Sequence, residues 1–258
     1  MNPRFPSLLC AGLLALAGPL QAGAADPAAG AAAAASAAVA DPARPPEDRA
    51  RDALRHPAEC LAFAGVHEGA RVLEILPGGG YYTRLLSAAV GPQGEVLAAV
   101  SPKSPTAAAD APEPAARIRA FASDPHYANV HVLVQRMAEL SPPAGFDLAW
   151  TSLNYHDLHH GIDMAAFNKA VFAALRPGGT FLVIDHSAED GSGARDEASL
   201  HRIDAALVRS ELLAAGFVAD GESAVLRNPG DDRKARVFDS AVRGNTDQFV
   251  LRFRKPGA

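Results

Sequence analysis

Cysteine is scarce in this 258-residue chain, which contains only Cys10 and Cys60. Cys10 lies in the apolar N-terminal segment that we expect to be removed during export, so Cys60 remains alone. A single cysteine cannot form a disulfide within the chain, which excludes the disulfide-stabilised scaffolds of small secreted domains. Because Cys60 stands in an apolar stretch, it is expected to be a small buried residue and not a nucleophile.

Positive charge is not in excess either. The chain carries 24 Lys and Arg residues against 29 Asp and Glu residues, a formal net charge of -5. Proteins that bind nucleic acids neutralise phosphates with clustered Lys and Arg, so this balance argues against a DNA or RNA partner. The hydrophobic share of 48% is ordinary for a globular protein, and the chain is long enough for one well-packed domain.

A long hydrophobic run is missing as well. Residues 1–24 have the pattern of a secretory signal peptide, in which Arg4 supplies the positive charge and Ala22–Ala24 the small residues at the cleavage site. Their apolar core is short and interrupted by glycine and proline, so we expect no stable membrane span after cleavage. These features predict an exported, periplasmic protein, with an uncleaved membrane anchor as the alternative.

Residues 25–46 are rich in alanine and proline and contain no aromatic residue. They show no apolar periodicity, and we interpret them as a disordered linker between the signal peptide and the domain. An alanine-rich helix is the competing interpretation, although the prolines limit it. The domain itself is predicted to span residues 47–258.

From residue 47 onward, helical and strand-like segments alternate. Five apolar runs are expected to be strands, and two more segments alternate in polarity as a hairpin does: Arg71–Leu76, Glu95–Val100, Val130–Val134, Phe146–Thr151 and Thr180–Asp185, then Phe217–Leu226 and Phe249–Phe253. The expected helices are Asp48–Leu54, Pro57–Phe63, a segment that ends at Ala89, Pro114–Ala122, Met164–Leu175 and Glu197–Ala215. Apolar strands that alternate with helices indicate a parallel sheet covered on both sides. The sequence therefore predicts an α/β, Rossmann-like fold, a mostly parallel seven-stranded sheet with helices on both faces and a C-terminal antiparallel β-hairpin.

A glycine turn connects the first predicted strand to the following helix. Gly78 and Gly80 are spaced for a sharp turn at which a ligand approaches the main chain. A purely structural turn is the alternative, because a glycine turn alone is a weak signal. A dinucleotide-binding loop fits less well, since Thr83 stands where its third glycine would be.

Glu74 followed by these glycines resembles the first motif of class I S-adenosylmethionine-dependent methyltransferases. The sequence Leu175–Gly179 and the C-terminal hairpin are similar to that family too, and the resemblance runs from about Pro57 to Phe253. Three phrases are also similar to a group of exported, predicted methyltransferases of unassigned substrate: Asn154–Asp157, Asp185–His186 and Leu200–Asp204.

The resemblance implies S-adenosylmethionine as cofactor, with five residues that hold it: Glu74, Gly78, Gly80, Met137 and Asn154. Three positions depart from the family pattern. Leu76 replaces the first glycine of the motif. Val100, or Ser101 beside it, stands where an acidic residue usually binds the ribose hydroxyls, and Arg136 stands where one commonly flanks the adenine. Each lost charge-assisted hydrogen bond is worth roughly 1.5–3 kcal/mol, so other side chains must substitute for full affinity.

The segment after the fourth strand carries the candidate catalytic residues. His156 and Asp157 lie at the carboxyl edge of the sheet and resemble the His-Asp pair of small-molecule O-methyltransferases. That resemblance implies that His156 removes the proton of the acceptor and that Asp157 orients the imidazole or caps the next helix. Histidine suits this task because its unperturbed pKa is about 6.5. A structural histidine is the alternative for His156, and His159 and His160 are expected to face solvent.

His186, His201 and Arg202 are candidate substrate contacts. His186 follows the fifth strand, while His201 and Asp204 are expected on one face of a helix, from which they would meet His156. Arg202 would hold an anionic group of the substrate through two parallel hydrogen bonds.

A metal site is considered and not predicted. His156 and His160 stand four residues apart, as paired ligands on a helix do, and imidazole and carboxylate suit zinc. However, the segment reads as a loop, and Asp157 replaces the glutamate of the zinc-protease motif.

These motifs predict an S-adenosylmethionine-dependent methyltransferase that acts on a hydroxyl or amine of a small molecule. One alternative is an exported binding protein that kept the fold and lost the cofactor, since the expected acidic residues are missing and the methyl donor is made in the cytoplasm. A metal-assisted hydrolase built on the His and Asp residues is a third. The polar loop 228–234 is expected to be either a lid over the substrate or a solvated hairpin connection. The acceptor and the oligomeric state stay open.

Overall fold

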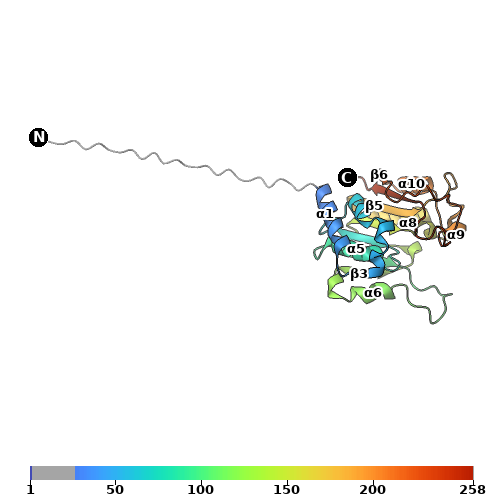
Figure 1. The fold of residues 1–258 in the computed structure, drawn as a ribbon, viewed down its shortest axis with the longest axis horizontal. Helices are drawn as coiled ribbons and strands as arrows, with labels where there is room; N and C mark the ends of the chain where they lie inside the picture. The colour runs from blue at the N-terminus through green and yellow to red at the C-terminus, as the bar shows by residue number, and fades with distance from the viewer. Residues whose placement is uncertain (2–26, 258) are drawn as a thin grey trace.

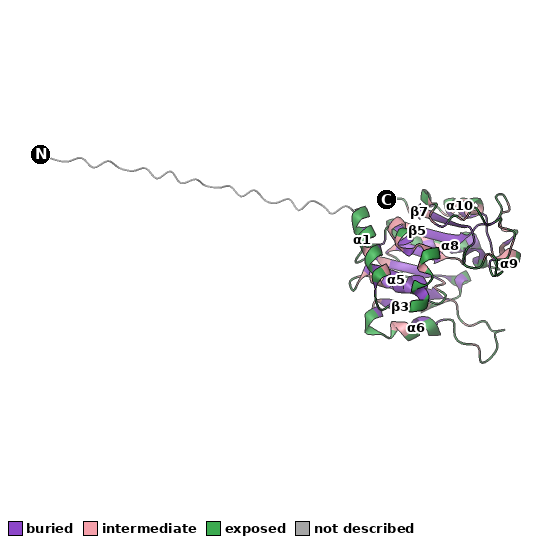
Figure 2. Cartoon of the chain, viewed as in Figure 1, coloured by how far each residue is buried: buried purple, intermediate pink, exposed green. Residues whose placement is uncertain are grey.

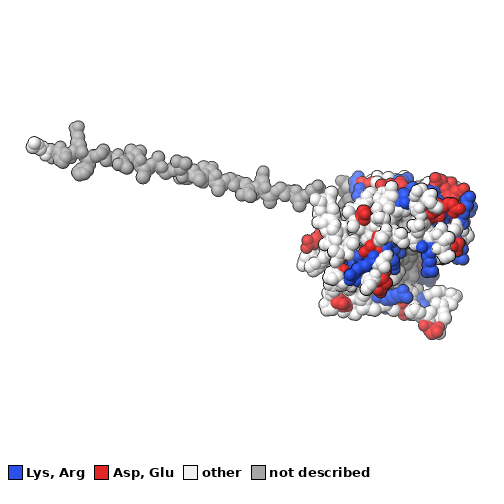
Figure 3. All heavy atoms as spheres, viewed as in Figure 1, with Lys and Arg blue, Asp and Glu red and all other residues white. Residues whose placement is uncertain are grey.

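The computed structural model describes Met1 and residues 27–257 (Figure 1). The predicted signal peptide, residues 1–24, lies outside the described residues except for Met1. Within residues 27–257, no helix combines the length and the apolar character that a membrane crossing requires. Acidic and basic side chains are intermixed over the face of the domain shown in Figure 3.

A single seven-stranded sheet forms the centre of the domain, in the order β3-β2-β1-β4-β5-β7-β6. Its strands are β1 (Arg71–Ile75), β2 (Glu95–Val100), β3 (Val130–Val134), β4 (Phe146–Ser152), β5 (Leu175–His186), β6 (Val218–Ser223) and β7 (Gln248–Arg254). The first five strands are parallel, and β7 runs antiparallel between β5 and β6. The predicted mostly parallel sheet with a C-terminal antiparallel hairpin is confirmed. The order of the strands reverses between β1 and β4, where this class of sheet binds ligands.

Helices cover both faces of the sheet. They are α1 (Pro27–Ala40), α2 (Pro46–Arg49), α3 (Asp52–Arg55), α4 (Pro57–Ala64), α5 (Tyr81–Val90), α6 (Ala116–Ala122), α7 (Tyr155–Leu158), α8 (Met164–Ala174), α9 (Glu197–Leu200) and α10 (Ala205–Ala214), with two short 3-10 helices, η1 (Pro125–Tyr127) and η2 (Met137–Glu139). Two apolar clusters result, one with α1, α4, α5 and α6 and the other with α8 and α10. Figure 2 shows the strands buried between helices whose outer sides are exposed. Alternate residues of β1 supply the two clusters, since Val72 faces one and Leu73 the other.

The predicted disordered linker is wrong for residues 27–46. Residues Pro27–Ala40 form helix α1, which packs on α4 and α5. Ala31, Ala35 and Ala38 are buried in that contact. Their spacing of four and three residues places them on one helix face, and their small side chains allow close approach. Alanine-rich composition therefore supports a packed helix here, and not an unfolded tether.

The predicted long helix Glu197–Ala215 is also wrong, because the chain breaks between α9 and α10. His201 has a left-handed φ of 56°, which ends α9. Ile203 then pairs with Ser187 in a short parallel bridge. Asp204 caps α10, where its carboxylate accepts a hydrogen bond of 2.8 Å from the Ala206 N–H. His201 and Asp204 consequently do not share a helix face.

Cys60 is fully buried on α4, as predicted. Burial raises the pKa of its thiol to about 12, so the thiol stays protonated at neutral pH. The residue packs among apolar side chains of the α5 side of the sheet.

Candidate functional site

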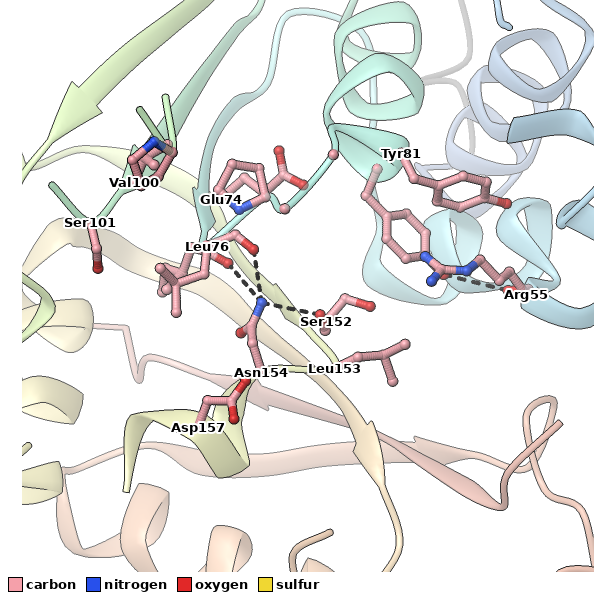
Figure 4. Close-up of a pocket in the computed structure, with 16 residues that line it drawn as sticks. Arg55, Glu74, Leu76, Tyr81, Val100, Ser101, Ser152, Leu153, Asn154 and Asp157 are labelled. Atoms are coloured by element: carbon pink, nitrogen blue, oxygen red, sulfur yellow. Dashed lines mark hydrogen bonds between the residues drawn. The ribbon is translucent and has the colours of Figure 1, made fainter. Parts of the chain in front are cut away.

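A cavity of about 500 Å³ opens at the carboxyl ends of β1 and β4, where the strand order reverses. Its wall includes Glu74 and Leu76 from the end of β1, Val100 from the end of β2, and Asn154 and Asp157 from the segment after β4 (Figure 4). Its volume lies in the range of small-molecule and cofactor pockets. The carboxyl edge of the sheet therefore carries a pocket at the place that the sequence indicated.

Glu74 contributes a buried carboxylate to this pocket. The residue is 2% exposed, and burial raises the pKa of Glu74 to about 7, against smaller lowering effects of Thr83 and Arg84. Its Oε2 atom has no hydrogen-bond partner among residues 27–257. Buried polar atoms are nearly always hydrogen bonded in folded proteins. The unpartnered oxygen therefore marks a position for a donor that a ligand would bring.

The two predicted glycines of the turn have different surroundings, since Gly78 borders the cavity and Gly80 borders helix α6. Gly78 has a left-handed φ of 58° and lines the cavity, and a Cβ placed on it would meet no described atom within 4 Å. Gly80, with φ of 84°, faces elsewhere, because its Cβ would lie 2.5 Å from the Phe121 ring. Gly80 does not line the cavity, so its predicted contact with the cofactor is not supported; it lets α5 approach α6.

Asn154 joins the ends of β1 and β4. Its side-chain amide donates to the carbonyls of Leu76, at 2.8 Å, and Ser152, at 3.1 Å. Its side-chain oxygen accepts a hydrogen bond from the Thr151 hydroxyl. These bonds occupy the amide within the protein, as the dashed lines in Figure 4 show. Asn154 lines the cavity, and its hydrogen bonds hold the wall in place, while its implied contact with the cofactor stays a prediction.

Arg55 lies in the wall of the cavity, and no motif in the sequence pointed to it. Its guanidinium lies 4.6 Å from the centre of the Tyr81 ring and 6.0 Å from that of Tyr82. No hydrogen bond or ion pair joins this guanidinium to another residue of the described part of the chain. Aromatic faces stabilise a cation while leaving its N–H groups free. Arg55 is therefore a half-buried positive charge with free donors at the pocket.

A second cavity, of about 730 Å³, adjoins the first. Both are lined by Leu76, Ser101 and Asp157, so they form neighbouring parts of one depression along the sheet edge. Met137 and Arg136 line the second cavity only. Met137, which the resemblance implies as a cofactor contact, lies at this second cavity together with Arg136.

His156 is held between two carboxylates. Asp185 is 2.8 Å from the His156 Nδ1 and also accepts a 2.8 Å hydrogen bond from its backbone N–H. Asp157 Oδ1 lies 3.3 Å from Nε2 on the other side. Burial opposes a positive charge on the ring, but the two carboxylates outweigh it and raise the pKa of His156 to about 10.

This environment bears on the predicted general base. A histidine with a pKa of about 10 carries its proton at pH 7 and cannot remove another. The ring is also 2% exposed and does not line the cavity, whereas Asp157 does. Of these two residues, Asp157 lines the cavity, and His156 contacts the Asp157 carboxylate from the interior of the protein.

The other predicted histidines fall in different places. His201 lies against this pair, with its Nδ1 3.3 Å from Asp157 Oδ1 and its ring centre 5.4 Å from that of His156. His186 is buried, with its Nδ1 2.6 Å from the Thr246 hydroxyl, and burial lowers its pKa to about 4. His201 thus meets His156 as expected, but from a turn and without Asp204. His186 is a buried neutral histidine that lines neither this cavity nor the adjoining one, with its ring centre 6.0 Å from that of His156.

Arg202 does not contact the cavity. Its side chain is 0% exposed and makes two hydrogen bonds to Asp231, of 2.8 and 3.1 Å. Its remaining donors bond to the carbonyls of Ser187 and Ala235. Because these bonds engage the buried guanidinium within the protein, Arg202 does not have the predicted role of holding an anionic substrate group. The same bonds anchor loop 228–234 to the core, so the loop is not simply a solvated connection.

The two remaining histidines of the segment differ in exposure. His160 is exposed, as expected. His159 is half-buried, with its Nε2 3.3 Å from Glu211 Oε2, so the expectation that it faces solvent is wrong. Glu211 also accepts a 2.8 Å hydrogen bond from the Tyr155 hydroxyl, which ties α7 to α10.

No protein-family model matches the chain, and no curated protein matches it by sequence. Solved structures do resemble it. One is a SAM-dependent methyltransferase from Aquifex aeolicus, with a TM-score of 0.57 and 18% identity, covering 80% of this chain and 93% of the other. Another is an S-adenosylmethionine-dependent methyltransferase from Mesorhizobium loti, with a TM-score of 0.54 and 19% identity, covering 79% of this chain and 99% of the other. At this level of identity the likeness concerns the fold. Together with the strand order, it shows that the chain has the fold of the class I S-adenosylmethionine-dependent methyltransferases.

Proposed function

We propose that this protein is an S-adenosylmethionine-dependent methyltransferase that acts on a hydroxyl or amine of a small molecule. The observation that carries the proposal is the cavity at the reversal of strand order, which combines an unpartnered buried carboxylate, an open glycine and a free guanidinium. The first two belong to residues that the resemblance assigns to cofactor binding, and their position in the cavity wall supports the proposal.

The residues present fit this cofactor. Its amino-acid end carries an ammonium and a carboxylate, for which Glu74 and Arg55 offer a charge of opposite sign. Gly78 leaves room for close approach to the main chain, and Met137 lies at the adjoining cavity for the adenine. S-adenosylmethionine supplies an electrophilic methyl group, and transfer breaks its carbon–sulfur bond and forms a bond from carbon to the acceptor atom.

On the acceptor side, Asp157 is the carboxylate among the residues that line both cavities. Its carboxylate accepts a hydrogen bond from the acceptor and thereby sets the direction of attack, and the acceptor proton leaves to solvent as the new bond to carbon forms. His156, fixed by Asp185, keeps Asp157 in place. Proximity and orientation of this kind supply a large share of the acceleration in a two-substrate reaction.

Export to the periplasm forms part of the proposal and rests on residues 1–24. A second candidate function, a binding protein of the same fold that has lost the cofactor, is favoured by one observation. Val100 and Ser101 line the cavity at the end of β2, where a carboxylate would hold the ribose. Binding of the cofactor separates the two candidates directly.

The test is calorimetric titration of the chain from Ala25, which retains every described helix and strand, with S-adenosylmethionine and S-adenosylhomocysteine. We expect a micromolar Kd, equivalent to roughly -8 kcal/mol. Absence of binding at millimolar ligand would overturn the methyltransferase proposal and leave the binding protein.

Gly78→Val provides the matching variant, with Gly69→Val as its control. Both glycines have a positive φ and no described atom within 4 Å of an added Cβ, but only Gly78 lines the cavity. Backbone strain is therefore common to both variants. Loss of binding in Gly78→Val alone would support contact between this glycine turn and the cofactor. Equal affinity in the two variants would rule that contact out.

A further inference from the structure

Three side chains with metal-binding atoms converge beside the cavity. His156 and Asp157 come from α7, and His201 comes from the turn that ends α9. One ligand atom from each lies within 4.8 Å of the others. Asp157 Oδ1 stands between the rings, 3.3 Å from His156 Nε2 and 3.3 Å from His201 Nδ1. His160, which stands four residues after His156 in the sequence, does not belong to this cluster.

One histidine atom that faces the cluster lacks a hydrogen-bond partner among the described residues. His201 Nδ1 is buried and has no hydrogen-bond partner among the described residues, because its approach to Asp157 lacks hydrogen-bond geometry. Leaving a buried ring nitrogen unpaired costs roughly 1–3 kcal/mol. A ligand at the centre of the cluster would remove that cost.

The outer contact of His156 also fits a ligating histidine. Asp185 holds the Nδ1 of His156 at 2.8 Å, which leaves Nε2 directed at Asp157. A carboxylate on the remote ring nitrogen is the usual support of a metal-bound histidine, because it fixes the tautomer and orients the ring. Asp185 is itself fully buried, so its position is well defined.

The local charge favours a cation. With both histidines neutral, Asp157 and Asp185 leave two negative charges within contact distance of His156. A divalent ion bound between the two rings would balance both carboxylates.

We propose that His156 Nε2, the Asp157 carboxylate and His201 Nδ1 form a binding site for a divalent first-row metal ion of the zinc type. Two imidazoles and one carboxylate are a donor set that such ions accept, and three protein ligands leave coordination positions open. Asp157 lines both cavities, so the open positions are on the side from which a small molecule enters.

The role of the ion rests on the proposed function. An ion at this position would bind an acceptor through oxygen and lower the pKa of its hydroxyl. The hydroxyl proton is then released to solvent, and the oxygen forms its bond to the methyl carbon as the carbon–sulfur bond breaks. This assignment favours acceptors with ionisable oxygens, such as phenols or hydroxy acids, over amines.

The direct test is metal binding in the absence of S-adenosylmethionine. The chain from Ala25 is treated with a chelator, dialysed and titrated with Zn²⁺ by calorimetry and with Co²⁺ by visible absorption. We expect one ion per chain with a Kd in the micromolar range or below, and a Co²⁺ spectrum with bands of a low-coordinate nitrogen and oxygen site. No saturable binding, or a Co²⁺ spectrum identical to that of the hydrated ion, would overturn the proposal.

Variants locate the site. His201→Gln and Asp157→Asn each remove one ligand and are expected to weaken Zn²⁺ binding at least 10-fold. Asp185→Asn removes the outer support, and we expect a loss of roughly 10- to 100-fold. His160→Gln is the matched control, because His160 is exposed on the same segment and should not change the affinity. Unchanged affinity in both ligand variants, with folding verified by circular dichroism, would contradict the assignment.

Failure of this inference can be told from failure of the proposed function. S-adenosylmethionine binding without metal binding would leave the methyltransferase proposal standing and remove the metal site. Metal binding without S-adenosylmethionine binding would establish the site and remove its assigned role.

Discussion

Asn154 donates a hydrogen bond of 2.8 Å from its side-chain amide to the backbone carbonyl of Leu76. This bond holds the end of β1 against the segment that follows β4. Leu76 has a left-handed φ of 52°, a conformation that normally belongs to glycine. It occupies the place of the first glycine in the family motif. The backbone conformation expected of that glycine is therefore kept, although the glycine is not.

This strain has a measurable consequence. We expect Leu76→Gly to be more stable than Leu76→Ala by about 1 kcal/mol, because glycine adopts a positive φ without the steric cost that alanine meets. Urea denaturation of the two variants gives the difference. Leu73, which lies in β1 and has no positive φ, is the control, and there alanine should be the more stable replacement. The same order at both positions would mean that Leu76 is not strained.

Arg55→Met should weaken the binding of S-adenosylhomocysteine by roughly 10- to 150-fold, since charge-assisted hydrogen bonds contribute about 1.5–3 kcal/mol. Adenosine lacks the carboxylate, so its affinity should stay unchanged in the same calorimetric titration. Arg51→Met is the control, because Arg51 lies 4.7 Å from the Tyr81 ring but does not line the cavity. Equal losses of affinity for both ligands would mean that Arg55 supports the cavity wall and does not bind the carboxylate of S-adenosylhomocysteine.

Stability should depend on the protonation of Glu74. Its folded-state pKa of about 7 lies above the ordinary glutamate value of 4.5, so the folded protein binds this proton more tightly than the unfolded chain. The stabilisation is complete below pH 4.5 and is lost as the pH rises to about 7, by about 3 kcal/mol in total. In Glu74→Gln the side chain is neutral throughout. The variant's unfolding free energy minus that of the wild type should therefore rise between pH 4.5 and pH 8, as measured with urea; a constant difference would contradict the shifted pKa.

Arg202→Met should destabilise the fold by roughly 3–5 kcal/mol, because it leaves the buried Asp231 carboxylate without its partner. Arg209→Met removes an arginine that pairs with Glu222 at the surface and should cost less than about 1 kcal/mol. Urea denaturation measures both. A cost below 1 kcal/mol for Arg202→Met would show that the pair does not anchor the loop. Weakened binding of an anionic ligand with full stability would restore the substrate role.

The fold and the glycine turn were predictable from the sequence because they depend on local patterns. Apolar runs that alternate with helical periodicity leave few arrangements other than a parallel sheet covered by helices. A strand followed by glycines and a helix likewise places Glu74 and Gly78 at the carboxyl edge, and both line the cavity. The position of the pocket follows from the order of the strands.

The tertiary structure decided which polar side chains have hydrogen-bond partners within the protein and which do not. Arg202 is buried against Asp231, whereas the Arg55 guanidinium has no hydrogen-bond or ion-pair partner in the described chain, although both are arginines near polar neighbours in sequence. Nothing local distinguishes them, because the partner of Arg202 is 29 residues away and reaches it only when loop 228–234 folds onto the core. The packing of α1 could not be predicted from the sequence for the same reason, because its alanine face is stabilised only by contact with α4 and α5.

The sequence by itself determined the class of fold, the strand–turn–helix that builds the pocket and the burial of Cys60, because each depends on residues that are neighbours in the chain. The tertiary structure alone decided the state of His156. Two carboxylates, one adjacent in sequence and one 29 residues away, meet its ring and hold a positive charge there. Coulombic interactions act through space, so the proton or metal ion that a histidine carries depends on which charges the fold brings within a few ångströms of it.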